Sequence, residues 1–193
     1  MRDFIFKPEL DAKGDVDRTR LKKELARMLG DRMADGKAKY LFSAEPLAAF
    51  AGEWFRLRTM VELPVVGMKE IPIAACTSGV ATSLSAWVAL ESSMFKPAGD
   101  PRAVELAARC RNWLERLCRE RFDGPLDLVS VDVAPDIRVM TATSRGSRLS
   151  RPYGHVRVEG VVRDESRIME IQRSGIGEAR AYGFGLVASR AMK

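Results

Sequence analysis

RSGIGEARAYGFGLV, residues 173–187, is the most distinctive stretch of this chain because it places four glycines among eleven residues. Gly175 and Gly177 would allow backbone amides to approach an anion closely. Gly183 and Gly185 would thin the edge of a following strand, so that another chain could lie against it. The alternative is a tight turn with a close helix–strand contact and no ligand. The glycines by themselves leave both interpretations open.

The spacing of these glycines excludes two common phosphate-binding loops. It is not the dinucleotide fingerprint, because too few residues follow for a helix, a further strand and an acidic ribose ligand. It is not a nucleoside-triphosphate loop, because no G-K-[ST] follows the glycines. We expect a short helical turn over residues 178–182, in which Arg180 adds positive charge beside the glycines.

The chain is basic and rich in arginine. Its 193 residues include 32 Lys and Arg against 26 Asp and Glu, which gives a net charge of +6 and a pI near 9.5. Arg outnumbers Lys by 23 to 9. Arginine contacts phosphates and base edges in a planar, bidentate geometry, so this bias favours a nucleic-acid partner. A genome whose codons favour arginine explains the same composition.

Composition also indicates where the protein works. An apolar fraction of 46% with 30% charged residues is typical of a globular domain. No stretch approaches the ~18 unbroken apolar residues of a membrane span, and the first residues lack the apolar region of a secretory signal. Cys76, Cys110 and Cys118 show no metal-type spacing and fit buried thiols in a reducing compartment. We therefore expect a cytoplasmic protein without a membrane partner.

A second basic signal lies in residues 138–157, RVMTATSRGSRLSRPYGHVR, which hold five arginines and no acidic residue. The middle of this stretch, residues 143–154, is rich in Ser, Gly and Pro and predicts a loop between strands. An arginine-rich loop can follow a phosphate backbone or enter a groove. The nucleic-acid contacts expected here come from Arg145, Arg148, Arg151, Tyr153 and Arg157.

The first half of the chain predicts a strand over 3–10, a helix over 17–34 and strands over 38–45 and 53–63. One helix face is apolar, and its members are Leu21, Leu25, Met28, Leu29 and Met33. The first two turns of the same helix carry cations, namely Arg18, Lys22 and Lys23. Acidic residues are preferred at that end because the helix dipole is positive there. These cations therefore either serve an anionic ligand or are ordinary solvated charges.

The second half predicts the same order of elements. These are a hairpin around Ser78-Gly79, a helix over 100–122 capped by Asp100, strands over 127–133, 137–143 and 153–162, a helix over 165–175 and a final strand over 183–190. We therefore expect an α+β fold of two tandem ferredoxin-like (RRM-like) domains. The Pro- and Gly-containing segment 64–72 favours a division into residues 1–68 and 69–193.

The stretch VEGVVRDESRIMEIQRSGIGEARAYGFGL, residues 158–186, resembles the C-terminus of the CRISPR repeat-RNA endoribonucleases of the RAMP superfamily, most closely the CasE type. The resemblance implies a double ferredoxin-like fold that binds the stem-loop of precursor CRISPR RNA (crRNA) and cuts at its 3′ base. It also implies that the protein keeps the mature crRNA and joins other CRISPR effector subunits. Cleavage in this family needs no metal or other cofactor.

The resemblance assigns roles to residues that match its motifs. Gly175, Gly177, Arg180, Gly183 and Gly185 would form the RNA-binding glycine-rich loop. The hairpin that approaches the RNA stem would carry Arg145, Arg148 and Arg151.

The chain departs from the family at the catalytic centre. CasE-like enzymes keep a His and a Tyr near the first helix, whereas the only histidine here is His155. We expect Arg20 and Lys23 to stabilise the scissile phosphate, with Arg18 and Lys22 binding RNA beside them. Acid or base chemistry by His155 is the second possibility. A divergent branch, such as type IV CRISPR systems, would fit this departure.

Two other functions remain open from the sequence. One is a crRNA-binding subunit of a CRISPR complex that has lost its active site. The other is an unrelated ferredoxin-like module whose glycine turn is structural.

Overall fold

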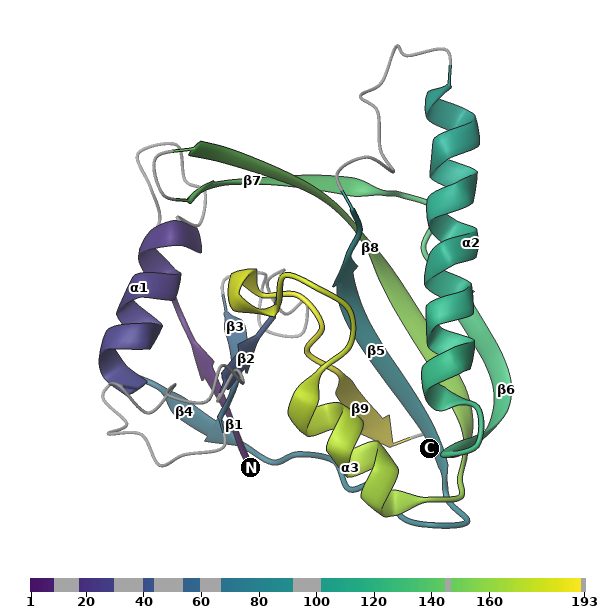
Figure 1. The fold of residues 1–193 in the computed structure, drawn as a ribbon. Helices are drawn as coiled ribbons and strands as arrows, with labels where there is room; N and C mark the ends of the chain where they lie inside the picture. The colour runs from purple at the N-terminus through teal and green to yellow at the C-terminus, as the bar shows by residue number, and fades with distance from the viewer. Residues whose placement is uncertain are drawn as a thin grey trace.

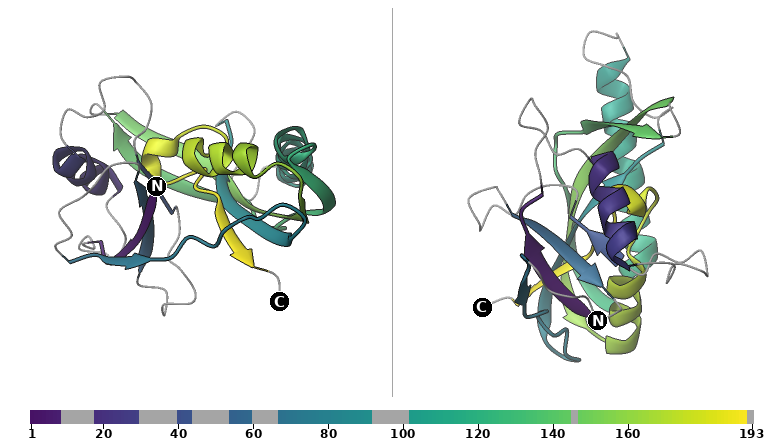
Figure 2. Two further views of the ribbon diagram at one scale, coloured as in Figure 1. Left: turned by 90° about the horizontal axis from the view of Figure 1, so that it is seen from below. Right: turned by 90° about the vertical axis from the view of Figure 1, so that its left-hand side faces the viewer.

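The computed structural model describes residues 1–8, 18–29, 40–43, 54–59, 67–91, 102–144 and 147–191. Figure 1 shows two β-sheets side by side, with α1 beside the first sheet and α2 and α3 beside the second. The two views of Figure 2 show the same arrangement from below and from the side. The elements are β1 (Arg2–Phe6), α1 (Arg18–Leu29), β2 (Tyr40–Phe42), β3 (Phe55–Thr59), β4 (Lys69–Ile71), β5 (Ala81–Ala89), α2 (Ala103–Phe122), β6 (Leu126–Val133), β7 (Arg138–Ser144), β8 (Ser147–Val162), α3 (Glu165–Ser174), η4 (Arg180–Tyr182) and β9 (Ala188–Ala191).

The first sheet has the strand order β2-β3-β1-β4, with every pair antiparallel. Alternate residues of β1 point to opposite faces, so Phe4 and Phe6 join a core with Leu21 and Leu25 of α1. The expected apolar face of this helix is confirmed at these two leucines. Met33 lies outside the described residues, as do the side chains of Met28 and Leu29.

The second sheet has the order β6-β8-β5-β9, and β7 extends β8 into a long hairpin. Along β8, Val156, Val158 and Val162 are buried in the core. That core also takes the apolar residues of α2 and α3, among them Cys110, Leu114, Cys118 and Ile168. When the strands of each sheet are numbered from the first one in the chain, with β7 left out, both sheets have the ferredoxin-like strand order 2-3-1-4. The expected double ferredoxin-like α+β fold is confirmed.

The three cysteines differ in how deeply they are buried. Cys110 and Cys118 are fully buried, and burial raises the pKa of the Cys118 thiol to about 12. Such thiols behave as small apolar core groups. Cys76 is only half-buried, so the expectation of a buried thiol is wrong there.

The expected hairpin around Ser78-Gly79 is wrong. Lys69–Ile71 pairs with β1 in the first sheet, whereas β5 pairs with β8 and β9. Gly79 does sit in a turn at positive φ, but residues 72–78, directly before it, form no strand. The division after residue 68 remains a prediction, and the pairing of β4 favours placing it a few residues later.

The helix expected over 100–122 begins at Ala103, with Arg102 at the N-cap position and no side-chain cap bond. Asp100, the expected cap, lies outside the described residues.

Candidate RNA-binding surface

Helix α1 presents two of its cations, Arg20 and Lys23, on the side away from the core. Because Leu21 and Leu25 are buried, Arg20 and Lys23 project into solvent. The Arg20 guanidinium donates from Nε to Glu24 Oε1 at 2.9 Å, one turn along the helix. This acidic partner was not expected, although the i,i+4 spacing carries the signal. The side chain of Arg18 lies outside the described residues.

Lys22 connects this helix to the glycine-rich segment 173–187. Its Nζ lies 4.6 Å from the ring centroid of Tyr182 in η4, within the range of a cation–π contact. Helix α1 also contacts β7. Two sequence signals far apart in the chain, the basic helix and the glycine-rich segment, are thus neighbours in space.

The arginine-rich stretch is a β-hairpin and not the expected loop. β7 and β8 pair in register up to Ser144 and Ser147. This stretch forms strands despite its Ser, Gly and Pro content. The reason is that β8 is an interior strand of the second sheet and runs on, without a break, into the hairpin. Figure 1 shows this hairpin crossing from the second sheet to a position above α1.

The arginines of the hairpin are described unequally. Arg148 pairs by backbone with Thr143, but its side chain lies outside the described residues, as does the whole of Arg145. Arg151 is 28% exposed, and its Nη1 lies 3.9 Å from the Glu178 carboxylate. The hairpin therefore adjoins the glycine-rich segment as well as α1.

Gly175, Gly177 and Gly185 of segment 173–187 serve close packing inside the chain. A Cβ on Gly185 would lie 2.1 Å from the Ile176 carbonyl oxygen, and one on Gly177 would lie 2.8 Å from Val88 Cγ1. The Ile176 amide donates to the Gly185 carbonyl at 3.0 Å, and the Gly185 amide donates to the Trp87 carbonyl at 2.7 Å. The close-contact alternative therefore describes these glycines well.

Two expectations for this segment need correction. Gly183 and Gly185 do not thin a strand edge, because β9 begins only at Ala188. The Gly175 amide is not open to an anion, because it donates to the Ile171 carbonyl at 2.8 Å and ends helix α3.

Arg180 is exposed on η4, the short helical turn expected at this place. Its Nη1 donates to the Ser174 carbonyl at 2.8 Å, so the guanidinium also caps the C-terminus of α3. Cations are favoured there because the helix dipole is negative at that end.

A second group of predicted residues lies on the sheet face opposite the core of α2 and α3. Tyr153 is only 5% exposed, with its ring 5.6 Å from Trp87 and 5.0 Å from Phe184 between centroids. These rings cover the Tyr153 ring, which leaves it little surface for the expected contact with RNA. Arg157 is exposed, donates to Ser83 Oγ at 3.0 Å and pairs with Glu159 at 2.6 Å.

His155 is half-buried against Trp87, with ring centroids 4.8 Å apart. Burial lowers the pKa of His155 below its usual value, and the charges of Arg157 and Arg138 lower it further. The lowered pKa favours the neutral imidazole, which is the form that can accept a proton.

Trp87 and Arg138 were not expected at this face. The Arg138 guanidinium lies 5.1 Å from the Trp87 ring centroid. The sequence pattern that could have indicated this face is the alternation of Ser83, Ser85 and Trp87 along β5. In the structure, all three lie opposite polar residues of β8.

No helix in the described part of the chain is long and apolar enough to cross a membrane. Within the same residues, no three His, Cys, Asp or Glu side chains gather closely enough to hold a metal ion.

The sequence matches no family model and no curated protein. Solved structures do match along the whole chain. CRISPR endoribonuclease Cse3 bound to a 19-nt RNA has a TM-score of 0.64 at 17% identity, covering 98% of this chain and 100% of that one. Cas6e from Escherichia coli K-12 has a TM-score of 0.62 at 14% identity, with both chains fully covered.

Cse3 from Thermus thermophilus, bound to an RNA that represents a pre-cleavage complex, has a TM-score of 0.57 at 20% identity. It covers 98% of this chain and 100% of that one. The chain therefore has the double ferredoxin-like fold of the CRISPR endoribonuclease Cse3 and of the CRISPR-associated protein Cas6e.

Proposed function

We propose that this protein binds the repeat stem-loop of precursor crRNA, cleaves it at the 3′ base of the stem and keeps the mature crRNA. The observation that carries the proposal is the meeting of α1, the β7–β8 hairpin and η4 within the fold of Cse3 and Cas6e. As in the surveillance complex that also matches this chain, the protein would then act beside other effector subunits. That match has a TM-score of 0.64 at 15% identity.

Charge supports RNA as the ligand of this surface. Exposed cations come from α1 at Arg20 and Lys23 and from η4 at Arg180. The hairpin sequence adds Arg145 and Arg148 without a single acidic residue between 138 and 157. Contacts to phosphates supply most of the affinity of such surfaces and make it depend strongly on salt.

Cleavage would proceed by attack of the ribose 2′-OH on the adjacent phosphorus. The 2′ O–H proton goes to a base, the P–O5′ bond breaks, and the leaving 5′ oxygen takes up a proton. The products are a 2′,3′-cyclic phosphate and a 5′-OH. We assign Arg20 and Lys23 to the charge of the pentavalent transition state, where fixed cations act most strongly. His155, whose lowered pKa favours the neutral imidazole, is the second candidate for the base.

The first test separates binding from cleavage. Wild-type protein is mixed with an RNA hairpin of the CRISPR repeat from its own genome, in EDTA, under single-turnover conditions. We expect one cut at the 3′ base of the stem and a cyclic-phosphate end. Arg20→Ala with Lys23→Ala should slow cleavage about 10²- to 10³-fold, while the RNA remains bound.

The matched control is Arg27→Ala, an exposed cation about two turns further along α1. It should leave the cleavage rate close to that of the wild type. Unchanged cleavage in an Arg20→Ala, Lys23→Ala protein that still binds RNA would remove these two residues from the mechanism.

A crRNA-binding subunit without nuclease activity is the second candidate function. It is favoured by the absence of histidine from α1 and by the pairing of Arg20 with Glu24. Tight hairpin binding without any cleavage, by wild-type protein at several pH values, would select this alternative.

A further inference from the structure

A buried ionic cluster lies where the two halves of the protein meet. Asp3 on β1 and Arg58 on β3 are fully buried, and Arg56 is 9% exposed. Arg58 donates from Nε to Asp3 Oδ1 at 2.7 Å and from Nη2 to Oδ2 at 2.8 Å. The Arg56 guanidinium donates to the same carboxylate. One carboxylate thus faces two guanidiniums, and the buried cluster carries one excess positive charge.

The second half of the chain compensates this charge. Arg58 Nη1 donates to the Gln172 carbonyl at 3.0 Å and to the Val187 carbonyl at 2.6 Å. Gln172 lies in the last turn of α3, where carbonyls lack a helical partner and the helix dipole is negative. An unpaired buried charge is costly, so these two acceptors are needed wherever Arg58 is buried.

The two acceptors bracket the glycine-rich segment. Gln172 precedes residues 173–187 directly, and Val187 is the last residue before β9. The first sheet also packs against the segment through Leu41, whose Cδ1 would lie 3.1 Å from a Cβ on Gly175. One guanidinium of the first half therefore holds both ends of the segment that carries η4.

This bracket bears on the candidate RNA surface because η4 and α1 must face each other there. Helix α1 packs on the first sheet through Leu21 and Leu25, on the face opposite Asp3 and Arg58. Its Lys22 lies over Tyr182 of η4. The first sheet thus fixes α1 on one side and the glycine-rich segment on the other.

We propose that Arg58 is a positioning residue that clamps the glycine-rich segment to the first sheet and so aligns η4 with α1 for RNA binding. Its effect on RNA rests on the function proposed above. The planar fork of arginine is required, since it reaches both carboxylate oxygens and two carbonyls at once. A lysine ammonium offers three donors from one point and cannot make this whole set of bonds.

Arg56 provides the matched control. It shares the buried Asp3 carboxylate with Arg58. The bonds that it makes within the described ranges, to Asp3 and Ser43, stay inside the first half. Arg56→Met and Arg58→Met therefore both disturb the cluster, but only Arg58→Met removes the bonds to the second half.

The experiment measures hydrogen exchange and RNA binding of both variants at a temperature where thermal unfolding shows each to be folded. We expect the amides of Ile176 and Gly185 to exchange at least about tenfold faster in Arg58→Met than in Arg56→Met. Amides of β5 and β8 should keep equal protection in both. The dissociation constant for the repeat hairpin should rise roughly tenfold more in Arg58→Met, because misplacement of binding groups weakens their joint contact.

If Arg58→Met does not fold, Arg58→Lys replaces it, with Arg56→Lys as its control. We then expect smaller differences of the same sign in amide exchange and in RNA affinity. Equal exchange of the segment in the Arg58 and Arg56 variants would overturn the clamp. Faster exchange with unchanged RNA affinity would overturn its role in alignment. If the wild type binds no hairpin RNA, the exchange data still decide the clamp, and the function proposed above fails by itself.

Discussion

The glycine-rich segment 173–187 and the β7–β8 hairpin both stand out in the sequence, yet the structure uses them in opposite ways. The segment is packed between the two halves, with Gly185 buried and its amide bonded to Trp87. The hairpin leaves the second sheet and reaches the side of α1 (Figure 1). The glycines concentrated in segment 173–187 mark a close approach of backbone within the chain. The arginines of residues 138–157, which have no acidic neighbour in that stretch of sequence, mark a projecting element.

The largest loss of stability should come from adding a side-chain atom at a glycine of segment 173–187 that has no room for one. Gly185→Ala places a Cβ within 2.1 Å of the Ile176 carbonyl oxygen, at a φ of +79°. We expect a decrease of about 3 kcal/mol or more in the free energy of unfolding, measured by urea denaturation. The backbone of the segment must shift, so RNA binding should weaken as well.

Gly79→Ala isolates the conformational part of this effect. Gly79 has nearly the same φ, +78°, but nothing lies within 4 Å of its Cβ position. It should cost only about 1 kcal/mol. Equal decreases at both glycines would mean that close packing is not what the segment requires.

The hairpin should show the reverse behaviour, a weaker affinity at constant stability. Arg145→Ala with Arg148→Ala should raise the dissociation constant for hairpin RNA roughly tenfold. The log–log salt slope should fall by about 1 for each phosphate that the variant no longer binds. Fluorescence anisotropy over a salt series measures both quantities.

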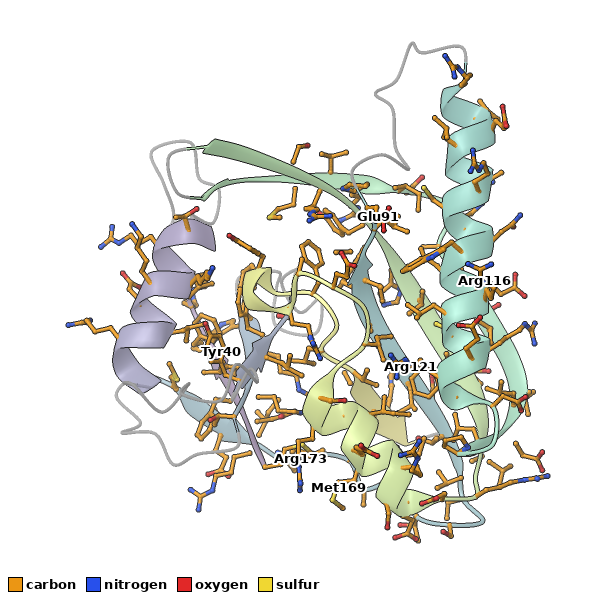
Figure 3. The ribbon with its side chains drawn as sticks, viewed as in Figure 1. Tyr40, Glu91, Arg116, Arg121, Met169 and Arg173 are labelled. Atoms are coloured by element: carbon orange, nitrogen blue, oxygen red, sulfur yellow. The ribbon has the colours of Figure 1, made fainter. Side chains whose placement is uncertain are left out.

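Arg116→Ala with Arg119→Ala removes the same charge from α2, on the side of the molecule away from α1 (Figure 3). This control should change affinity only slightly. If it weakens binding as much as the hairpin variant, the hairpin has no special role and net charge alone attracts the RNA.

The smallest effect concerns His155 on the sheet face. Its pKa is lowered in the folded protein, so the unfolded chain binds the proton more tightly. Stability should therefore fall as the pH drops below about 6.5, the unperturbed value, and level off below the folded pKa. His155→Gln should flatten this part of the profile between pH 7 and 5, measured by urea denaturation. An unchanged profile would contradict the assigned shift.

Local patterns predicted much of the fold. The alternation of Val156, Val158 and Val162 and the apolar stripe of α2 follow from strand and helix periods, which act over a few residues. The ferredoxin-like order of both sheets followed from the order of these elements.

Contacts between distant residues were not predictable in this way. Arg58 bonds to Gln172, 114 residues away in the sequence, and no pattern in the sequence around either residue predicts this bond. The polar neighbours of Tyr153 along its strand predict a surface position, but Trp87 and Phe184 from other strands and loops cover it. Charge singled out the basic helix and the arginine-rich stretch 138–157 separately, while their proximity depends on how the halves pack.

The central claim is that this protein processes crRNA on the surface formed by α1, the hairpin and η4. It is tested most directly by purifying the protein from its native host, extracting the bound RNA and sequencing it together with its end groups. We expect uniform short RNAs that end in one shared hairpin with a 2′,3′-cyclic phosphate. No bound RNA, or a random population, would contradict the claim and leave the glycine-rich segment with a structural role alone.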